Sequence, residues 1–150
     1  MSDILSEGRK RRIADDTQMI FMGRTLERLY GPDAVDVLVE HQHQKHKKEW
    51  QQRAKACGRQ DPGYLKCLFS HDAHDYEILR DDPDCLEVKV TRCVHAEVFR
   101  RYNAADLGEK LICSGDHAVV EGYNPRIQFV RPTTCMEGEC CHFIFKLNRP

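Results

Sequence analysis

The sequence predicts an α+β fold, in which a helical N-terminal half packs on a small, mainly antiparallel sheet with a helical crossover. A change of hydrophobic period supports this prediction. Up to the segment 81–84 apolar residues recur at helical spacing, whereas Leu86, Val88 and Val90 alternate with polar residues as in a half-buried strand. The 150 residues suit a single domain, with a helical part at about 1–82 and a part carrying the sheet and the motifs at about 83–150.

The N-terminal half is predicted to contain three helices. The first ends at Gly31, because glycine commonly follows the last turn of a helix, and Pro32 opens the second, which ends at Gly58. The third begins at Asp61-Pro62 and extends to Leu79. The histidines of this half are expected on solvated helix faces, because lysines surround the first group and would repel a cation: His41, His43, His46, His71 and His74.

The C-terminal half is predicted to alternate between strands and helices. After the strand around Val88, two helices follow at 94–102 and 104–123, the second N-capped near Asn103. Two further strands, at 127–131 and 142–147, form an antiparallel hairpin with a turn at 137–139.

Composition excludes several classes of function. The 23 basic and 24 acidic residues leave a formal charge of −1, which argues against a protein that binds nucleic acid by neutralising phosphates. No apolar run approaches the roughly 20 residues of a membrane span. The N-terminal segment lacks the apolar region of a secretory signal, so we expect a cytoplasmic protein with reduced thiols and no membrane partner. Nothing in the sequence indicates the oligomeric state.

Side chains suited to chemistry gather near the ends of the predicted C-terminal elements. They are Cys93, His95 and Glu97 after the first strand, Cys113, Asp116 and His117 in the next long helix, and Arg131 at the end of a strand. Three more cysteines, Cys135, Cys140 and Cys141, lie in or beside the hairpin loop.

Two chemistries suit this set, and the residues alone do not decide between them. A thiolate nucleophile needs a base and a carboxylate, which Cys113 could have in His117 or His95 and in Asp116 or Glu97. A zinc site needs about four ligands, which Cys93, His95, Cys113 and His117 would supply. No cofactor is favoured, and zinc remains the alternative.

A family resemblance adds to this interpretation. The sequence from Val90 to Phe145 contains an Arg-Cys pair after a strand, a Cys-x-x-Asp in a helix, and a Gly-aromatic-Asn-Pro turn. A strand ending in Arg and Thr and a Gly-x-x-Cys-x-Phe hairpin follow. In this order and spacing the segment resembles the L-2-amino-thiazoline-4-carboxylic acid hydrolase family.

The resemblance implies a small-molecule substrate and a ring-opening hydrolysis. Attack at C2 of a cyclic isothiourea, directly by water or through a covalent intermediate, would release the ring sulfur and give N-carbamoyl-L-cysteine. The matching positions are Cys93, Cys113, Asp116, Arg131 and Cys141. The resemblance then makes Cys113 the candidate nucleophile with Cys93 as its neighbour or alternative, Asp116 the partner of the amidinium or the base, and Arg131 the partner of the substrate carboxylate. Roles for His95, His117 and Glu97 in substrate binding rest on their placement alone.

Three functions therefore remain open. The first is a hydrolase acting on a cyclic amidine-like substrate. The second is a non-catalytic domain that binds a small molecule at the same end of the sheet. The third is a zinc protein that uses the Cys/His cluster.

Overall fold

The computed structural model describes residues 5–150. Two long helices, α1 (Glu7–Tyr30) and α2 (Asp33–Cys57), precede the short helical segment η1 (Pro62–Leu68) and two strands, β1 (His74–Asp82) and β2 (Cys85–Cys93). The helices α3 (Val94–Arg101), α4 (Ala105–Gly108) and α5 (Gly115–Tyr123) lead to the strands β3 (Ile127–Val130) and β4 (Cys141–Leu147), with the segment η2 (Glu109–Cys113) between α4 and α5. The predicted α+β class is confirmed.

Both long helices end, and the second begins, where the sequence predicts. The side chain of Ser6 accepts a hydrogen bond from the backbone N–H of Arg9 and caps α1. Gly31 follows α1 with a φ of 91°, and Gly58 follows α2 in the left-handed conformation. Glycine adopts both conformations at little steric cost, which explains why the helices end there.

The predicted third helix is wrong beyond residue 68. The segment η1 ends at Leu68, and residues 74–82 form strand β1, which pairs with β2 in antiparallel orientation. The helical part of the chain therefore does not extend to residue 82. Most of β1 is exposed at the sheet edge, so its sequence lacks the clean alternation of a half-buried strand.

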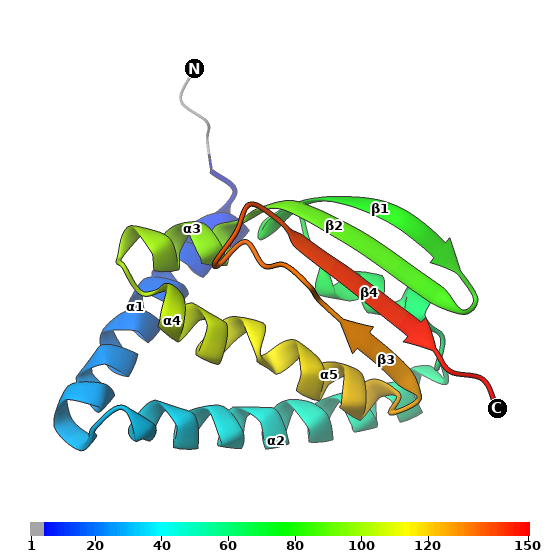
Figure 1. Cartoon of the computed structure of the whole chain (residues 1–150), viewed down its shortest axis with the longest axis horizontal. Coiled ribbons are helices and arrows are strands. Elements are labelled where there is room, and N and C mark those ends of the chain that lie inside the picture. The colour runs from blue at the N-terminus through cyan, green and yellow to red at the C-terminus, as the bar shows by residue number, and fades with distance from the viewer. Residues whose placement is uncertain (1–4) are drawn as a thin grey trace.

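The four strands form one antiparallel sheet in the order β1-β2-β4-β3. The predicted hairpin of the last two strands is present, with residues 131–140 as its loop. Leu86, Val88 and Val90 of β2 and Phe143 and Phe145 of β4 are buried on one face, as period-two patterning requires. Figure 1 shows the helices beside this sheet, with α5 between α2 and β3.

The predicted helix at 104–123 is interrupted. Residues Glu109–Cys113 form a π-helical turn, in which the backbone N–H of Ser114 donates to the carbonyl oxygen of Glu109 at 2.9 Å. Such turns insert an extra residue and are frequent at functional sites. Here the turn contains Cys113 and shifts the phase between α4 and α5 just before Asp116.

Close packing fixes α5 against α2. A Cβ atom at Gly122 would lie only 2.8 Å from the Cα of Lys47, so glycine is needed where the two backbones approach. Trp50 of α2 contacts Tyr123 of α5 edge-on, with ring centroids 6.3 Å apart.

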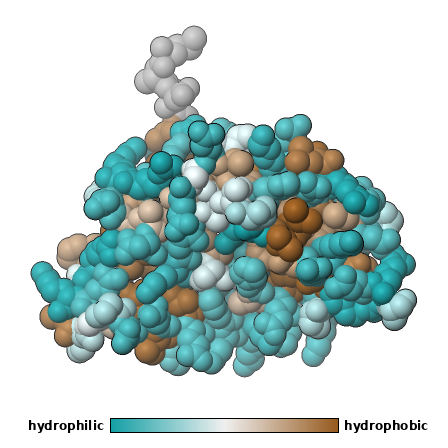
Figure 2. All heavy atoms as spheres, viewed as in Figure 1, coloured by the Kyte–Doolittle hydropathy of each residue, from teal (hydrophilic) through white to brown (hydrophobic). Residues whose placement is uncertain are grey.

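Polar residues cover most of the face shown in Figure 2, and the hydrophobic ones gather in separate patches. Among residues 5–150, no helix combines the length and the apolar character that crossing a membrane requires.

Candidate functional site

Antiparallel pairing brings four strand ends to one end of the sheet. His74 at the start of β1 pairs with Cys93 at the end of β2, and Val90 of β2 pairs with Cys141 at the start of β4. Arg131 follows β3 directly. Each of these residues thus lies at the same end of the sheet, although they come from distant parts of the sequence.

A cavity of about 160 Å³ opens at this end of the sheet. Helix α5 and the π-helical turn form one wall, and helix α1 and the start of α3 form another. Its polar and sulfur-bearing lining consists of Arg12, His74, Cys93, His95, Cys113, Asp116, Arg131 and Cys141. The apolar lining consists of Leu68, Phe69, Ile112 and Phe143. A small cavity with convergent polar groups on an apolar base is typical of a binding site for a small molecule.

Arg131 organises one side of the cavity. Its Nη1 forms an ion pair with Oδ2 of Asp116, and its Nη2 donates to the backbone carbonyl oxygen of Cys113 at 3.0 Å. The guanidinium lies over the rings of Phe129 and Phe143, at 5.6 and 5.4 Å from their centroids. Only 7% of the side chain is exposed, and Nε is buried without a hydrogen-bond partner among the described residues. An unpaired buried donor costs free energy and suits an anionic ligand.

Asp116 has an environment that suits acid–base chemistry. Burial raises the pKa of Asp116 to about 6, and the nearby Arg131 opposes this rise. A carboxyl group with a pKa near neutrality changes protonation state close to working pH.

The three cavity cysteines differ in how readily they ionise. Burial raises the pKa of Cys93 to about 11. Burial raises the pKa of Cys113 further, with the carboxylates of Glu109 and Asp116 adding to the effect. In contrast, the pKa of Cys141 is lowered by its hydrogen bonds with Cys135, and Arg131 contributes in the same direction.

Geometry explains the behaviour of Cys141. Its Sγ accepts a hydrogen bond from the backbone N–H of Cys135 at 3.0 Å, and the Sγ of Cys135 itself donates to the carbonyl oxygen of Val90 at 3.6 Å. A fixed backbone donor and a nearby guanidinium both favour a thiolate. Cys141 is therefore the cavity sulfur whose surroundings most favour the charged form.

A buried carboxylate supports His95. Nδ1 of His95, in the first turn of α3, lies 2.7 Å from Oδ2 of Asp16 on α1. The Asp16 side chain is only 4% exposed. His74 lies beside this pair, and the ring centroids of His74 and His95 are 6.2 Å apart. Burial lowers the pKa of His74 to about 4.

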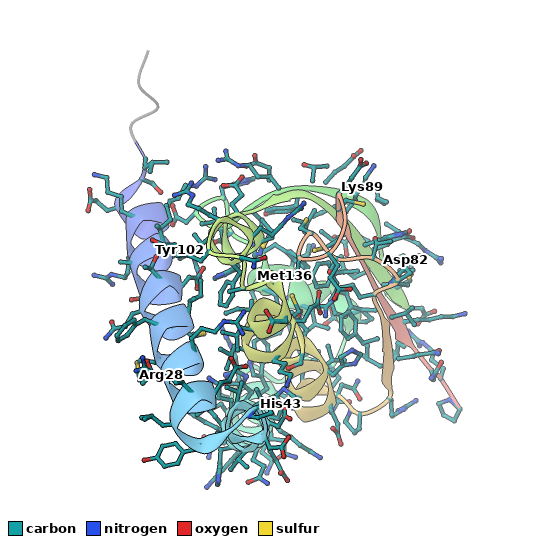
Figure 3. All side chains as sticks on the ribbon, turned by 60° about the vertical axis from the view of Figure 1, so that its left-hand side comes forward. Arg28, His43, Asp82, Lys89, Tyr102 and Met136 are labelled. Atoms are coloured by element: carbon teal, nitrogen blue, oxygen red, sulfur yellow. The ribbon has the colours of Figure 1, made fainter. Side chains whose placement is uncertain are left out.

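The loop 131–140 begins at the cavity residue Arg131 and is held at several points. Arg100 donates to the carbonyl oxygens of Cys135 and Gly138 at 3.3 and 3.2 Å. Thr134 donates to Glu109 at 2.5 Å. Met136, labelled in Figure 3, is almost fully buried and packs so closely on Gly108 that a Cβ there would clash with its thioether. The loop is thus tied to the helical crossover.

Two predicted site residues lie elsewhere. Glu97 forms an ion pair with Arg92 and lines a separate, open depression that it shares with Cys93. His117 is exposed on α5, where its ring lies 4.7 Å from that of Phe129. Neither residue lines the cavity, so we leave both out of the proposed site.

The predicted zinc quartet is not assembled. Cys93, His95 and Cys113 line the cavity, but His117 does not. Within the described part of the chain, no group of three or more His, Cys, Asp or Glu side chains is placed to hold a metal ion.

His41 is exposed on α2 as predicted and His71 is exposed in a turn, but the other three histidines predicted to be solvated are partly buried. His43 of α2, labelled in Figure 3, contacts Ser114 Oγ at 2.8 Å, and Nδ1 of His46 is buried beside Gly115. His74 lines the cavity instead of a helix surface, because residues 74–82 form a strand. These corrections follow from helix docking and from the missed strand.

Sequence reasoning missed Arg12 and Asp16, which reach the site from α1. They stand in the polar run Arg9–Asp16, whose composition is typical of a solvated helix face. Asp16 is buried in the folded chain, where α1 packs against α3 and Asp16 contacts His95. His74 had a usable signal, since a β-turn at Asp82-Pro83-Asp84 before a clear strand is compatible with a preceding hairpin partner.

Comparison with known proteins gives one match. The model of the L-2-amino-thiazoline-4-carboxylic acid hydrolase family matches residues 17–145. No similar curated protein and no similar solved structure is found. The match spans most of the chain, from α1 to β4, and includes every cavity residue except Arg12. The chain therefore belongs to the L-2-amino-thiazoline-4-carboxylic acid hydrolase family.

Proposed function

We propose that the protein hydrolyses a small cyclic amidine or isothiourea, such as 2-amino-thiazoline-4-carboxylate, to N-carbamoyl-L-cysteine. One observation carries this proposal: Cys141, Asp116 and Arg131 line the same small cavity. The reaction needs a nucleophile for C2, a carboxylate for the amidinium and a cation for the substrate carboxylate. Family membership supports a hydrolase, and the cavity supplies these groups.

The ion pair of Asp116 and Arg131 is the proposed binding element. The ionised carboxylate of Asp116 would accept hydrogen bonds from the substrate amidinium. The unpartnered Nε of Arg131 would donate to the substrate carboxylate. Because the cavity holds about 160 Å³, it suits a substrate of a single small ring.

We place the nucleophile at Cys141. Its environment favours the thiolate, whereas burial and nearby carboxylates hold the proton on Cys113. The Cys141 sulfur would form a bond to C2, and the C2–S bond of the ring would break with its electron pair on the departing sulfur. That thiolate takes a proton from solvent, and water then hydrolyses the covalent intermediate. Cys113 and Cys93 would line the pocket as thiols.

Turnover of 2-amino-thiazoline-4-carboxylate by the purified full chain tests the proposal. We expect Cys141→Ser to lower kcat by at least about 1,000-fold, because removing a covalent nucleophile eliminates its route. Cys113→Ser and Cys93→Ser are matched controls from the same cavity, and we expect each to retain activity within about tenfold. Loss in Cys113→Ser with activity retained in Cys141→Ser would move the nucleophile to Cys113.

A binding function without catalysis is the second candidate. The cavity, with a buried donor that has no partner among residues 5–150, favours a bound anion whether or not chemistry follows. Calorimetry on the same preparation separates the two functions. Binding of the thiazoline by a chain that does not turn it over would support the second candidate and contradict the first.

A further inference from the structure

We propose that Asp16 is a positioning residue that holds His95 as the general base of this site. The inference rests on the proposed hydrolysis and adds a residue from α1 to its machinery. Asp16 lies just before the stretch that the family model matches.

The contact between Asp16 and His95 fixes which imidazole nitrogen carries the proton. An ionised carboxylate only accepts hydrogen bonds, so Nδ1 of His95, 2.7 Å from Oδ2 of Asp16, must carry the proton. Nε2, at the far side of the ring, then bears the lone pair. Since the ring lines the cavity, this lone pair is available to a water molecule there.

Burial makes this arrangement stiff. The side chain of Asp16 is 4% exposed and that of His95 is 16% exposed, so solvent screens their contact little. Asp16 comes from α1 and His95 from the first turn of α3, and these two helices pack against each other. The pair therefore joins two elements and holds the imidazole in one orientation.

The other titratable neighbours do not replace His95. Burial lowers the pKa of His74 to about 4, so His74 is neutral near pH 7, and its Nδ1 is buried without a hydrogen-bond partner among residues 5–150. Asp116 is engaged by Arg131. Among the groups that line the cavity, His95 is the imidazole that a buried carboxylate orients.

In the hydrolytic step, Nε2 of His95 takes a proton from water as the water oxygen bonds to C2 of the intermediate. The bond between C2 and the Cys141 sulfur then breaks, and its electron pair returns to that sulfur as a thiolate. The remaining hydroxyl proton is released to solvent as the carbonyl forms. Two protons thus leave the water, one through His95, and the carbamoyl group of the product is neutral.

Kinetics of Asp16→Asn test this role. We expect kcat to fall by about 100- to 10,000-fold, as for loss of an aligned general base, with KM changed by less than about threefold. Glu87→Gln is the matched control, because Glu87 accepts from His142 at 2.5 Å in a carboxylate–imidazole pair outside the cavity. Glu87→Gln should leave kcat unchanged. A folded Asp16→Asn variant with kcat within threefold of the wild type contradicts the inference.

Imidazole spectra give a readout that does not depend on turnover. In the full chain labelled with ¹⁵N-histidine, we expect His95 to carry its proton on Nδ1, and Asp16→Asn to abolish this preference while Glu87→Gln preserves it. His95→Gln identifies the signal. A wild-type His95 protonated on Nε2 alone overturns the inference. A wild type inert on the thiazoline would instead overturn the proposed function, and the spectra would still decide the role of Asp16.

Discussion

Arg131 and Cys113 lie 18 residues apart, and Nη2 of Arg131 donates to the backbone carbonyl oxygen of Cys113 at 3.0 Å. This contact ties the end of β3 to the π-helical turn. The carbonyl is available because a π-helical turn and the following helix leave it without an intrahelical donor. The same guanidinium pairs with Asp116, so one side chain holds both the turn and the carboxylate.

Replacing Arg131 by lysine should impair substrate binding. Lysine keeps the charge, but its donors share one nitrogen and cannot replace the three separate nitrogens with which Arg131 meets Asp116, Cys113 and the ligand. Loss of a hydrogen bond to a charged group corresponds to a KM increase of about 10- to 100-fold in steady-state assays with the thiazoline. Arg126→Lys, at an exposed arginine that donates to Asn148, is the control and should leave KM unchanged. Equal KM values for the two variants would exclude Arg131 from substrate binding.

Activity should decline in acid because of Asp116. Its pKa is raised to about 6, so the carboxyl group is protonated below that pH and no longer holds the cationic amidinium. We expect kcat/KM to fall about tenfold per pH unit below pH 6. Asp116→Asn should lower kcat/KM at neutral pH and remove this limb from the pH profile. An unchanged limb in Asp116→Asn would assign it to another group.

The same carboxyl group should affect stability in a definite direction. Its folded-state pKa lies above the ordinary value of 3.8, so its stabilising contribution is complete below about pH 3.8 and is lost as the pH rises through about 6. Relative to Asp116→Asn, the wild type should lose up to about 3 kcal/mol of unfolding free energy between pH 4 and 7. Urea unfolding of both proteins across this range measures the difference. A difference that grows in favour of the wild type would contradict the assigned pKa direction.

Cys141 should ionise before the other cavity cysteines. Its hydrogen bonds with Cys135 and the charge of Arg131 lower its pKa, whereas burial raises those of Cys93 and Cys113. Subtracting the thiolate absorbance of Cys141→Ser from that of the wild type gives the titration of Cys141, and the same subtraction with Cys113→Ser gives that of Cys113. The Cys141 curve should therefore rise at a lower pH than the Cys113 curve. Exposed Cys57 and Cys67 contribute equally to each protein and cancel. The reverse order would return the reactive thiol to Cys113.

Gly122→Ala should destabilise the fold. The added methyl group would meet the backbone of Lys47, which cannot move away as a flexible side chain would. Overpacking of this kind costs about 1–3 kcal/mol and separates α5 from α2. Chemical denaturation of the wild type and of Gly122→Ala measures the loss. Because α5 carries Asp116, activity should fall with stability.

The sequence predicted the fold class and most elements because helix ends and strand periodicity are local properties. In the structure Gly31 and Gly58 follow the ends of α1 and α2, as predicted. Leu86, Val88 and Val90 alternate with polar residues in strand β2, also as predicted. Strand β1 escaped prediction because it lies at an edge and is mostly exposed, so burial did not shape its pattern. The π-helical turn escaped because nothing in the local composition marks an inserted residue.

The candidate site, too, was predictable from the sequence only in part. The residue types at Cys93, His95, Cys113, Asp116 and Arg131 were recognisable from sequence, and all five line one cavity. Glu97 and His117 stood equally close in sequence, yet the helices turn them away from it. The partnership of Asp16 with His95, 79 residues apart, and the easier ionisation of Cys141 depend on which groups meet in space. Sequence thus determined the local elements and the available chemistry, whereas helix docking and strand pairing decided which groups act together, because burial and electrostatic contact arise only between segments brought together by folding.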